Sequence, residues 1–204
     1  MKIYLLRHPE TDWNGEWRFQ GRTDIPVSKK GKESLEKALP VLCKLPIDII
    51  YTSPLQRAKI VAEMINERTG IPFEVDERII EADCGHWEGR KVPELMKEET
   101  EFMAKWWANP YAVPIPGGET YQDVEKRTSA LLQEIIAKNT NALLVSHGIA
   151  ITTMLRYILE LPYEKTAILR IENLGLAKIE VDDFGKGFVI SNPAGILDLL
   201  SFPL

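Results

Sequence analysis

Two basic side chains follow an apolar segment near the start of the sequence. Residues 3–6 form a short apolar run, and Arg7 and His8 come directly after it. Such a run is typical of a strand buried on both faces. Arginine offers a planar cation that matches phosphate oxygens, and neutral imidazole keeps a lone pair that can attack phosphorus. Taken alone, Arg7 and His8 are better interpreted as ordinary loop residues than as a catalytic site. A catalytic role requires that other functional side chains lie close to them in the fold.

A second strand end supplies another arginine. Residues 47–51 read as a buried strand, and the next helix is predicted to begin with Ser53 as its N-cap and Pro54 at its first position. Arg57 then lies in the first turn of that helix. The carboxyl end of a strand and the positive end of a helix both favour anions there. This placement makes a merely solvated surface charge the less favoured interpretation of Arg57.

A third strand end supplies another histidine. Residues 142–145 form an apolar run, and His147 and Gly148 stand where the next helix should begin. His147 therefore occupies the same kind of position as His8. Because the carboxyl ends of parallel strands meet at one edge of a sheet, we expect the two histidines and the two arginines to form one oxyanion site.

An acidic segment follows the third predicted strand. Residues 78–89 carry Glu81, Asp83 and Glu88 among apolar residues and glycines. A partly buried acid beside an anion can act as a general acid. The alternative is an acidic loop without a catalytic role, and spacing alone does not choose among the three carboxyl groups.

The elements that must position these residues alternate along most of the chain. Apolar runs separated by helical patterns predict a mostly parallel α/β sheet flanked by helices, a three-layer sandwich. Ser28, Gly70 and the Thr120–Asp123 pair are expected helix boundaries, and Pro40 should kink or shorten its helix. The predicted strands are residues 3–6, 47–51, 72–76, 142–145, 168–171, 176–181 and 188–191, with a hairpin loop at 182–187 between the last two.

One stretch departs from the alternation. In residues 91–116, apolar side chains recur every three to four positions before a proline-rich return. The pattern predicts a lid-like helical insertion, at about 82–118, over the active site. Trp106 and Trp107 are interpreted there as packing residues first and as a pocket wall second.

Composition bounds the remaining classes of function. A chain of 204 residues with 45% hydrophobic content is predicted to be one domain, 1–204, and its net charge of −5 disfavours nucleic-acid binding. Cys43 and Cys84 lack metal-ligand spacing and indicate reduced cysteines in a cytoplasmic protein. No apolar run has transmembrane length. We expect no cofactor, no metal and no membrane partner, and we leave a homodimer open.

With these residues assembled, the sequence resembles the histidine phosphatase superfamily, also called the phosphoglycerate-mutase-like family. The resemblance covers nearly the whole chain and consists of six motifs in the family's order. They are Arg7-His8-Pro9-Glu10-Thr11 with Asp12-Trp13-Asn14, Phe19-Gln20-Gly21 with Asp24-Ile25-Pro26-Val27, Ser53-Pro54-Leu55-Gln56-Arg57-Ala58, Glu81 through Gly89, Pro116-Gly117-Gly118-Glu119-Thr120, and Val145-Ser146-His147-Gly148.

The resemblance implies roles for these positions. His8 would be the nucleophile that becomes phosphohistidine, and Glu81 would protonate the leaving oxygen and then activate water. The groups holding the phosphoryl oxygens would be Arg7, Arg57 and His147. Those lining the phosphate and substrate pocket would be Asn14, Gln20, Gly21 and Gly148. Fixed Arg and His side chains can supply positioning and charge neutralisation without a metal.

Pro9 is a departure from the family pattern. It replaces the usual Gly, so it removes a backbone N–H and should hold His8 extended. If the family's phosphate site used that amide, one donor is missing here. We expect activity to survive because the charged groups are all present.

The implied function is a metal-independent phosphomonoesterase that acts on a small phosphorylated metabolite. A cofactor-dependent phosphoglycerate mutase is the alternative within the family, but the Arg-His-Tyr that follows the mutase Glu is replaced here by Ala82-Asp83-Cys84, and the insertion lacks the mutase arginine pair. Phosphoserine and α-ribazole-phosphate phosphatases fit equally. From another class, a non-catalytic phosphate-binding regulatory protein remains, with Pro9 as the inactivating change.

Overall fold

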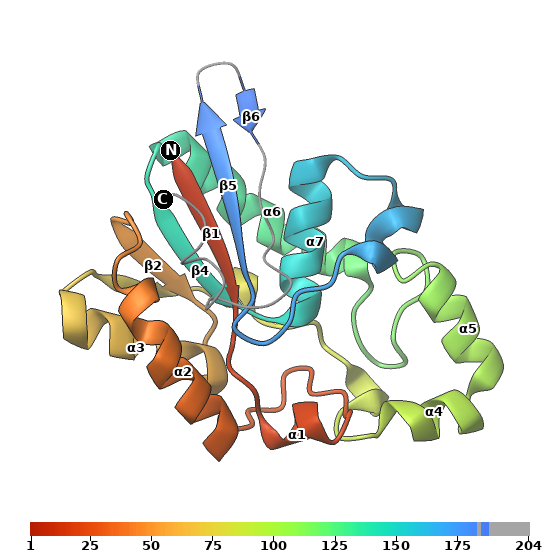
Figure 1. The fold of residues 1–204 in the computed structure, drawn as a ribbon. Coiled ribbons are helices and arrows are strands. Elements are labelled where there is room, and N and C mark those ends of the chain that lie inside the picture. The colour runs from red at the N-terminus through yellow and green to blue at the C-terminus, as the bar shows by residue number, and fades with distance from the viewer. Residues whose placement is uncertain (183–184, 188–204) are drawn as a thin grey trace.

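A central six-stranded sheet organises residues 1–182 and 185–187, which are the residues that the computed structural model describes. Its strand order is β3-β2-β4-β1-β5-β6, and helices cover both faces (Figure 1). The strands β3, β2, β4 and β1 are parallel, β5 is antiparallel to β1, and β6 is antiparallel to β5. The predicted three-layer α/β arrangement is confirmed. The strands are β1 (Lys2–Arg7), β2 (Ile49–Thr52), β3 (Phe73–Val75), β4 (Ala142–Ser146), β5 (Leu176–Asp182) and β6 (Gly185–Gly187).

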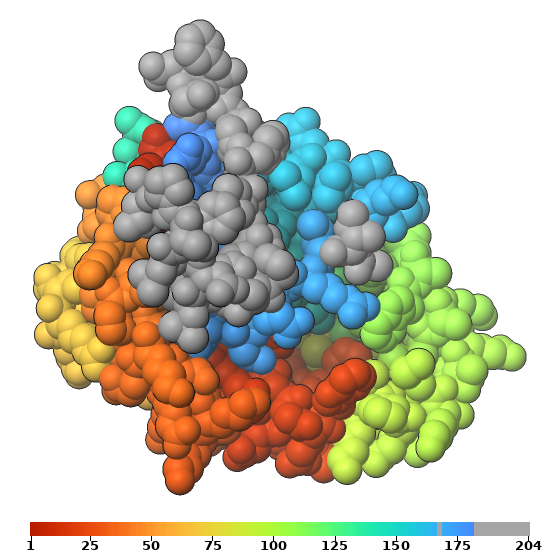
Figure 2. Space-filling view, viewed as in Figure 1, coloured from red at the N-terminus to blue at the C-terminus, as the bar shows by residue number. Residues whose placement is uncertain are grey.

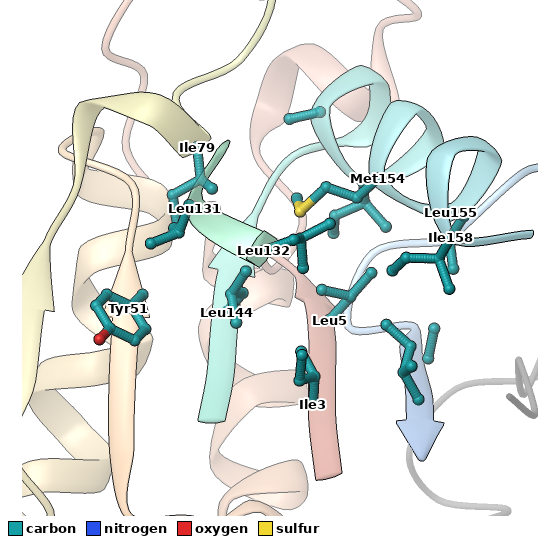
Figure 3. Close-up of a cluster of buried hydrophobic side chains, with 14 of the residues drawn as sticks. Ile3, Leu5, Tyr51, Ile79, Leu131, Leu132, Leu144, Met154, Leu155 and Ile158 are labelled. Atoms are coloured by element: carbon teal, nitrogen blue, oxygen red, sulfur yellow. The ribbon is translucent and has the colours of Figure 1, made fainter. Parts of the chain in front are cut away.

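The strand that carries Arg7 alternates its side chains between two cores. Ile3 and Leu5 pack on one face against α6 (Tyr121–Lys138) and α7 (Gly148–Leu159). Figure 3 shows Leu5 near Leu132, Leu155 and Ile158, and Ile3 farther along the same strand. Burying one such side chain contributes about 1.5–3 kcal/mol, so both faces strongly specify the register of β1.

The opposite face of the sheet holds the second core. Tyr4 and Leu6 pack there against α2 (Lys29–Leu42) and α3 (Gln56–Thr69). Because both faces are covered, β1 reads as a continuous apolar run rather than an alternating one. The helices on each side therefore fix the carboxyl end of β1, where Arg7 and His8 lie.

Most predicted helix boundaries are confirmed. The Ser28 hydroxyl accepts a hydrogen bond from Gly31 N at 3.0 Å and opens α2, which continues past Pro40 to Leu42. Gly70 ends α3 with a left-handed φ of +74°. Thr120 and Asp123 form the predicted capping box of α6.

The predicted start of α3 is wrong. The helix begins at Gln56, and Leu55 rather than Ser53 is its N-cap. The Ser53 hydroxyl is engaged elsewhere, 2.6 Å from the His147 ring. A hydroxyl group that was expected to cap the start of a helix therefore contacts a histidine of the candidate site instead.

The predicted strand at 168–171 is also wrong. Residues Tyr163–Ile168 form a 3₁₀ helix, η3, and the residues after it do not pair with the sheet. The carbonyl groups of this segment accept hydrogen bonds from side chains instead of from a neighbouring strand. Arg7 Nη1 donates to Ile171 O at 2.8 Å, and the Thr152 hydroxyl donates to Leu169 O at 3.3 Å.

The predicted hairpin after β5 forms, but β6 occupies Gly185–Gly187, where a loop was expected. The predicted strand at 188–191 lies outside the described residues.

Two short helices occupy the predicted helical excursion. They are α4 (Val92–Glu98) and α5 (Thr100–Ala108), and they enclose a third apolar cluster that includes Trp87 and Trp106. Their action as a lid stays a prediction. The smaller elements are α1 (Asp12–Gly15), η1 (Glu77–Ile79) and η2 (Gly85–Trp87). Within the described part of the chain, no helix combines the length and the apolar character needed to cross a membrane.

Candidate active site

One cavity lies beyond the carboxyl ends of the parallel strands. Its volume is about 390 Å³. Figure 2 shows the surface hollowed where the red N-terminal loops, the green α4–α5 region and the blue segment near residue 170 meet. The predicted site residues that line it are Arg7, His8, Asn14, Gln20, Gly21, Arg57, Glu81 and Gly148. His147 is the predicted residue that does not.

The His8 ring has a defined hydrogen-bonding direction. Its Nδ1 lies 2.7 Å from Pro9 O, and because a carbonyl can only accept, Nδ1 carries the proton. The other ring nitrogen, Nε2, then keeps the lone pair. Burial lowers the pKa of His8 well below 6.5, and the nearby Arg57 and Arg7 lower it further. The His8 ring is therefore neutral and oriented at neutral pH, and its Nε2 keeps the lone pair that a nucleophile needs.

Pro9 acts on His8 through its carbonyl group. That oxygen accepts the Nδ1 proton, and any residue at this position could supply it. The replacement of Gly by Pro thus preserves the contact that selects the His8 tautomer. It also restricts the backbone next to the histidine.

The buried Arg57 and the half-buried Arg7 form a basic floor with His8. Arg57 is fully buried and donates from Nη1 to Thr23 O at 2.8 Å and from Nη2 to Gly21 O at 2.7 Å. The Nε atoms of Arg57 and Arg7 have no hydrogen-bond partner among the described residues. Buried cations held mainly by carbonyls are costly unless an anion joins them. We call Arg7, His8 and Arg57 the basic floor.

His147 lies behind His8 rather than in the cavity wall. The two ring centroids are 5.1 Å apart, and His147 is fully buried. Its Nε2 is 2.6 Å from the Ser53 hydroxyl, while its Nδ1 has no partner in the part of the chain that the structure describes. Burial, followed by the charge of Arg57, lowers its pKa well below 6.5. Only Nδ1 is left to contact a ligand.

Glu81 sits at the N-terminus of α7. Its Oε1 accepts hydrogen bonds from Ala82 N at 2.9 Å and Ala150 N at 3.1 Å, and its Oε2 accepts one from Ile149 N at 3.2 Å. It is nine-tenths buried and lines the cavity. A Cβ atom on Gly148 would lie 3.7 Å from Glu81 Oε2 and 3.6 Å from Arg7 Cζ, which places Gly148 between the carboxylate and the floor.

The two competing carboxylates are placed differently. Neither Asp83 nor Glu88 lines the cavity. Asp83 accepts a hydrogen bond from Gly85 N at 2.8 Å, and both Glu88 oxygens are occupied by N–H and O–H donors of neighbouring residues. The geometry therefore supports Glu81 among the three acids.

Asn14 and Gln20 line the cavity, and both are held by hydrogen bonds from Thr11. Asn14 Oδ1 accepts from Thr11 N at 3.0 Å, and Gln20 Oε1 accepts from the Thr11 hydroxyl at 3.0 Å. Because their oxygen atoms are engaged, their amide NH₂ groups are the donors left for a ligand.

Several cavity residues were not predicted from the sequence. Arg18 and Arg170 line the cavity. Its upper part is mostly apolar, and the sequence suggested only Trp106 and Trp107 for this part. We call this upper part the outer wall. Its members are Arg18, Phe19, Val92, Trp106, Trp107, Pro110, Tyr121, Ile149, Thr152, Leu169 and Arg170. The Phe-Gln-Gly motif was a signal for the neighbouring Arg18, whereas the mistaken strand at 168–171 hid Arg170.

Known proteins were compared with the whole chain. The model of the histidine phosphatase superfamily (branch 1) matches residues 3–192. A probable phosphoglycerate mutase, GpmB, from Salmonella choleraesuis is 32% identical over 98% of this chain and 95% of its own.

Solved structures agree with this match. A mycobacterial glucosyl-3-phosphoglycerate phosphatase, solved with VO3, has a TM-score of 0.84 at 27% identity, covering 95% of this chain and 98% of its own. Bacillus stearothermophilus YhfR has a TM-score of 0.84 at 29% identity, covering 94% and 96%. The order of motifs, the buried Arg–His floor and these matches agree: the chain belongs to the histidine phosphatase superfamily.

Proposed function

We propose that the protein is a metal-independent phosphomonoesterase that works through a phosphohistidine. One observation carries the proposal: an oriented, neutral His8 lies in one cavity with two arginines whose Nε atoms are unpartnered and with a buried glutamate. These are the parts that phosphoryl transfer requires, namely a nucleophile, fixed positive charge and a proton donor.

The reaction would proceed in two steps. His8 Nε2 attacks phosphorus, and a P–N bond forms as the bond to the leaving oxygen breaks. Protonated Glu81 gives its proton to that oxygen. A water molecule then attacks the phosphohistidine while Glu81 accepts its proton, which releases phosphate and restores the neutral imidazole. Arg7 and Arg57 neutralise the charge on the phosphoryl oxygens in both steps.

The outer wall supports a small phosphorylated metabolite as the substrate. The cavity is larger than a phosphate group needs, and aromatic side chains such as Trp106, Trp107 and Tyr121 line it. The leaving group would therefore present apolar surface to this wall. The similar proteins have names that refer to different phosphate esters, so family membership leaves the ester open.

A phosphoglycerate mutase is the second candidate, and a specific observation favours it. The helical excursion lacks the mutase arginine pair, but Arg18 and Arg170 line the cavity from other segments. Arg18 is already held by Glu16 and by Gly89 O, whereas Arg170 has no ion pair or hydrogen bond among the described residues. Arg170 is thus the side chain that could hold a substrate carboxylate.

A single assay separates the candidates. A panel of phosphorylated metabolites is incubated with the protein in excess chelator, and released phosphate and isomerised ester are both measured. We expect phosphate release to continue in chelator. Efficient interconversion of 2- and 3-phosphoglycerate, primed by the bisphosphate and with little release, would favour the mutase. Orthophosphate binding without any turnover would favour a regulatory protein.

A further inference from the structure

We propose that Glu88 is a positioning residue for phosphoryl binding: it holds the loop of residues 21–23, whose carbonyl groups orient Arg57. The inference rests on the proposed function, because it assigns Glu88 to the anion site of that reaction. Glu88 does not touch the cavity. It acts through the loop, so its effect should appear in the affinity for phosphate.

The carboxylate of Glu88 gathers donors from two separate segments. Oε1 accepts from Arg22 N at 2.8 Å and from Cys84 N at 3.3 Å. Oε2 accepts from Thr23 N at 2.9 Å and from the Thr23 hydroxyl. Four donors converge on one side chain, and three of them belong to Arg22 and Thr23. The loop is therefore fixed to the segment that also carries Glu81.

The same loop holds Arg57 from its other side. Gly21 O accepts from Arg57 Nη2 at 2.7 Å, and Thr23 O accepts from Arg57 Nη1 at 2.8 Å. The N–H groups of the loop point to Glu88, and its carbonyl groups point to Arg57. These two carbonyls set the guanidinium plane, and Nε keeps no hydrogen-bond partner among the described residues.

The contact requires both a carboxylate and a glycine. A carboxylate can accept four hydrogen bonds, whereas the NH₂ group of an amide would face N–H donors and accept none. Gly21 has a φ of +52°, and a Cβ atom there would lie 2.0 Å from Glu88 Oε1. The close approach of Glu88 thus accounts for the glycine as well as for the turn.

The test measures orthophosphate affinity by calorimetry, together with kcat and KM on p-nitrophenyl phosphate. We expect Glu88→Gln to weaken orthophosphate binding by about 10-fold, because N–H donors of the loop lose their charged acceptor. Glu98→Gln is the matched control. Glu98 is an exposed acid paired with Arg90, so its loss should leave the affinity unchanged.

A double-mutant cycle gives a readout that a general loss of folding would not produce. In an Arg57→Ala background, Glu88→Gln should change orthophosphate affinity by less than about twofold, because the pathway through Arg57 is already absent. An equal loss in both backgrounds would overturn the proposal. Should Glu88→Gln fail to fold, Thr23→Val removes one donor to Glu88, and an unchanged affinity in that variant would also overturn it.

The two proposals fail differently. Orthophosphate binding without hydrolysis of any ester would reject the phosphomonoesterase and leave the role of Glu88 measurable. Absence of orthophosphate binding in the unmodified protein would reject both.

Discussion

The basic floor and the outer wall of the cavity are built by different means. The floor consists of the buried His8 and Arg57 and the half-buried Arg7, at the carboxyl ends of β1 and β2, and backbone carbonyls fix its guanidinium donors. The outer wall combines residues of the helices α4, α5, α6 and α7 with residues of loops far apart in the sequence, and some of these residues are exposed, such as Trp107 at 45%. In the proposed reaction, the floor would carry out the chemistry and the outer wall would select the ester.

The largest expected effect is on the floor. His8→Ala should lower turnover by about 10⁴-fold or more, because the P–N bond can no longer form. The protein is incubated with substrate and quenched in base, where phosphohistidine survives, and the modified peptide is identified by mass spectrometry. We expect the label on His8. A label on His147, or undiminished labelling of His8→Ala, would exchange the assignments of the two histidines.

The next effect concerns proton transfer at the edge of the floor. Glu81→Gln should slow turnover by about 10²–10⁴-fold while orthophosphate affinity is kept, because a general acid is lost but the arginines remain. Steady-state kinetics measures the turnover, and calorimetry measures the orthophosphate affinity. Asp83→Asn is the control and should stay close to normal. If Asp83→Asn loses most of its turnover while Glu81→Gln is nearly normal, the general acid is Asp83 rather than Glu81.

A third effect is on stability and should depend on pH. The folded-state pKa values of His8 and His147 lie well below 6.5, so unfolding takes up protons at acidic pH. Above about pH 6.5 the two histidines add no penalty. As pH falls below that value toward the folded-state pKa values, they should destabilise the protein.

Thermal melts from pH 8 to pH 5 test this effect. A His8→Asn, His147→Asn double variant should lose less of its melting temperature on acidification than the unmodified protein. His86→Asn is the control, because His86 is exposed and lies outside the floor. Equal acid sensitivity in all three proteins would show that the histidines do not contribute.

The smallest effect is expected in the outer wall. Trp107→Ala should raise KM about 3- to 10-fold for esters with bulky apolar leaving groups, since burial of part of an aromatic face contributes about 1 kcal/mol. The variant's kcat for a small ester should hardly change. Comparing naphthyl phosphate with methyl phosphate checks this. An equal loss on both esters would mean that wall and floor are not separable.

The floor could be predicted from the sequence because its positions follow from local rules. An apolar strand followed by Arg7-His8, and a strand–helix turn carrying Arg57, place their side chains by topology alone. The wall depends on which distant segments pack together. Arg170 could not be foreseen because the Leu169 and Ile171 carbonyls bind side chains instead of a neighbouring strand.

Ser53 shows the same limit at shorter range. A serine before a proline is a good helix cap by local rules. Its hydroxyl lies 2.6 Å from a histidine 94 positions away, and that contact overrides the cap. Likewise, strand-end rules predicted that His147 would be near His8 but not that it would lie behind it.

The place of β1 in the sheet has a consequence for how the protein folds. β1 lies between β4 and β5. Lys2 N therefore donates a hydrogen bond to Asn141 Oδ1, 139 positions away in the sequence, and the amino group of Met1 donates one to Val181 O, 180 positions away. Contacts that close such long loops form late and slow the folding reaction. β1, which ends at Arg7, should therefore acquire both of its neighbouring strands only near the end of folding, so the helices would form before His8 reaches its place in the cavity.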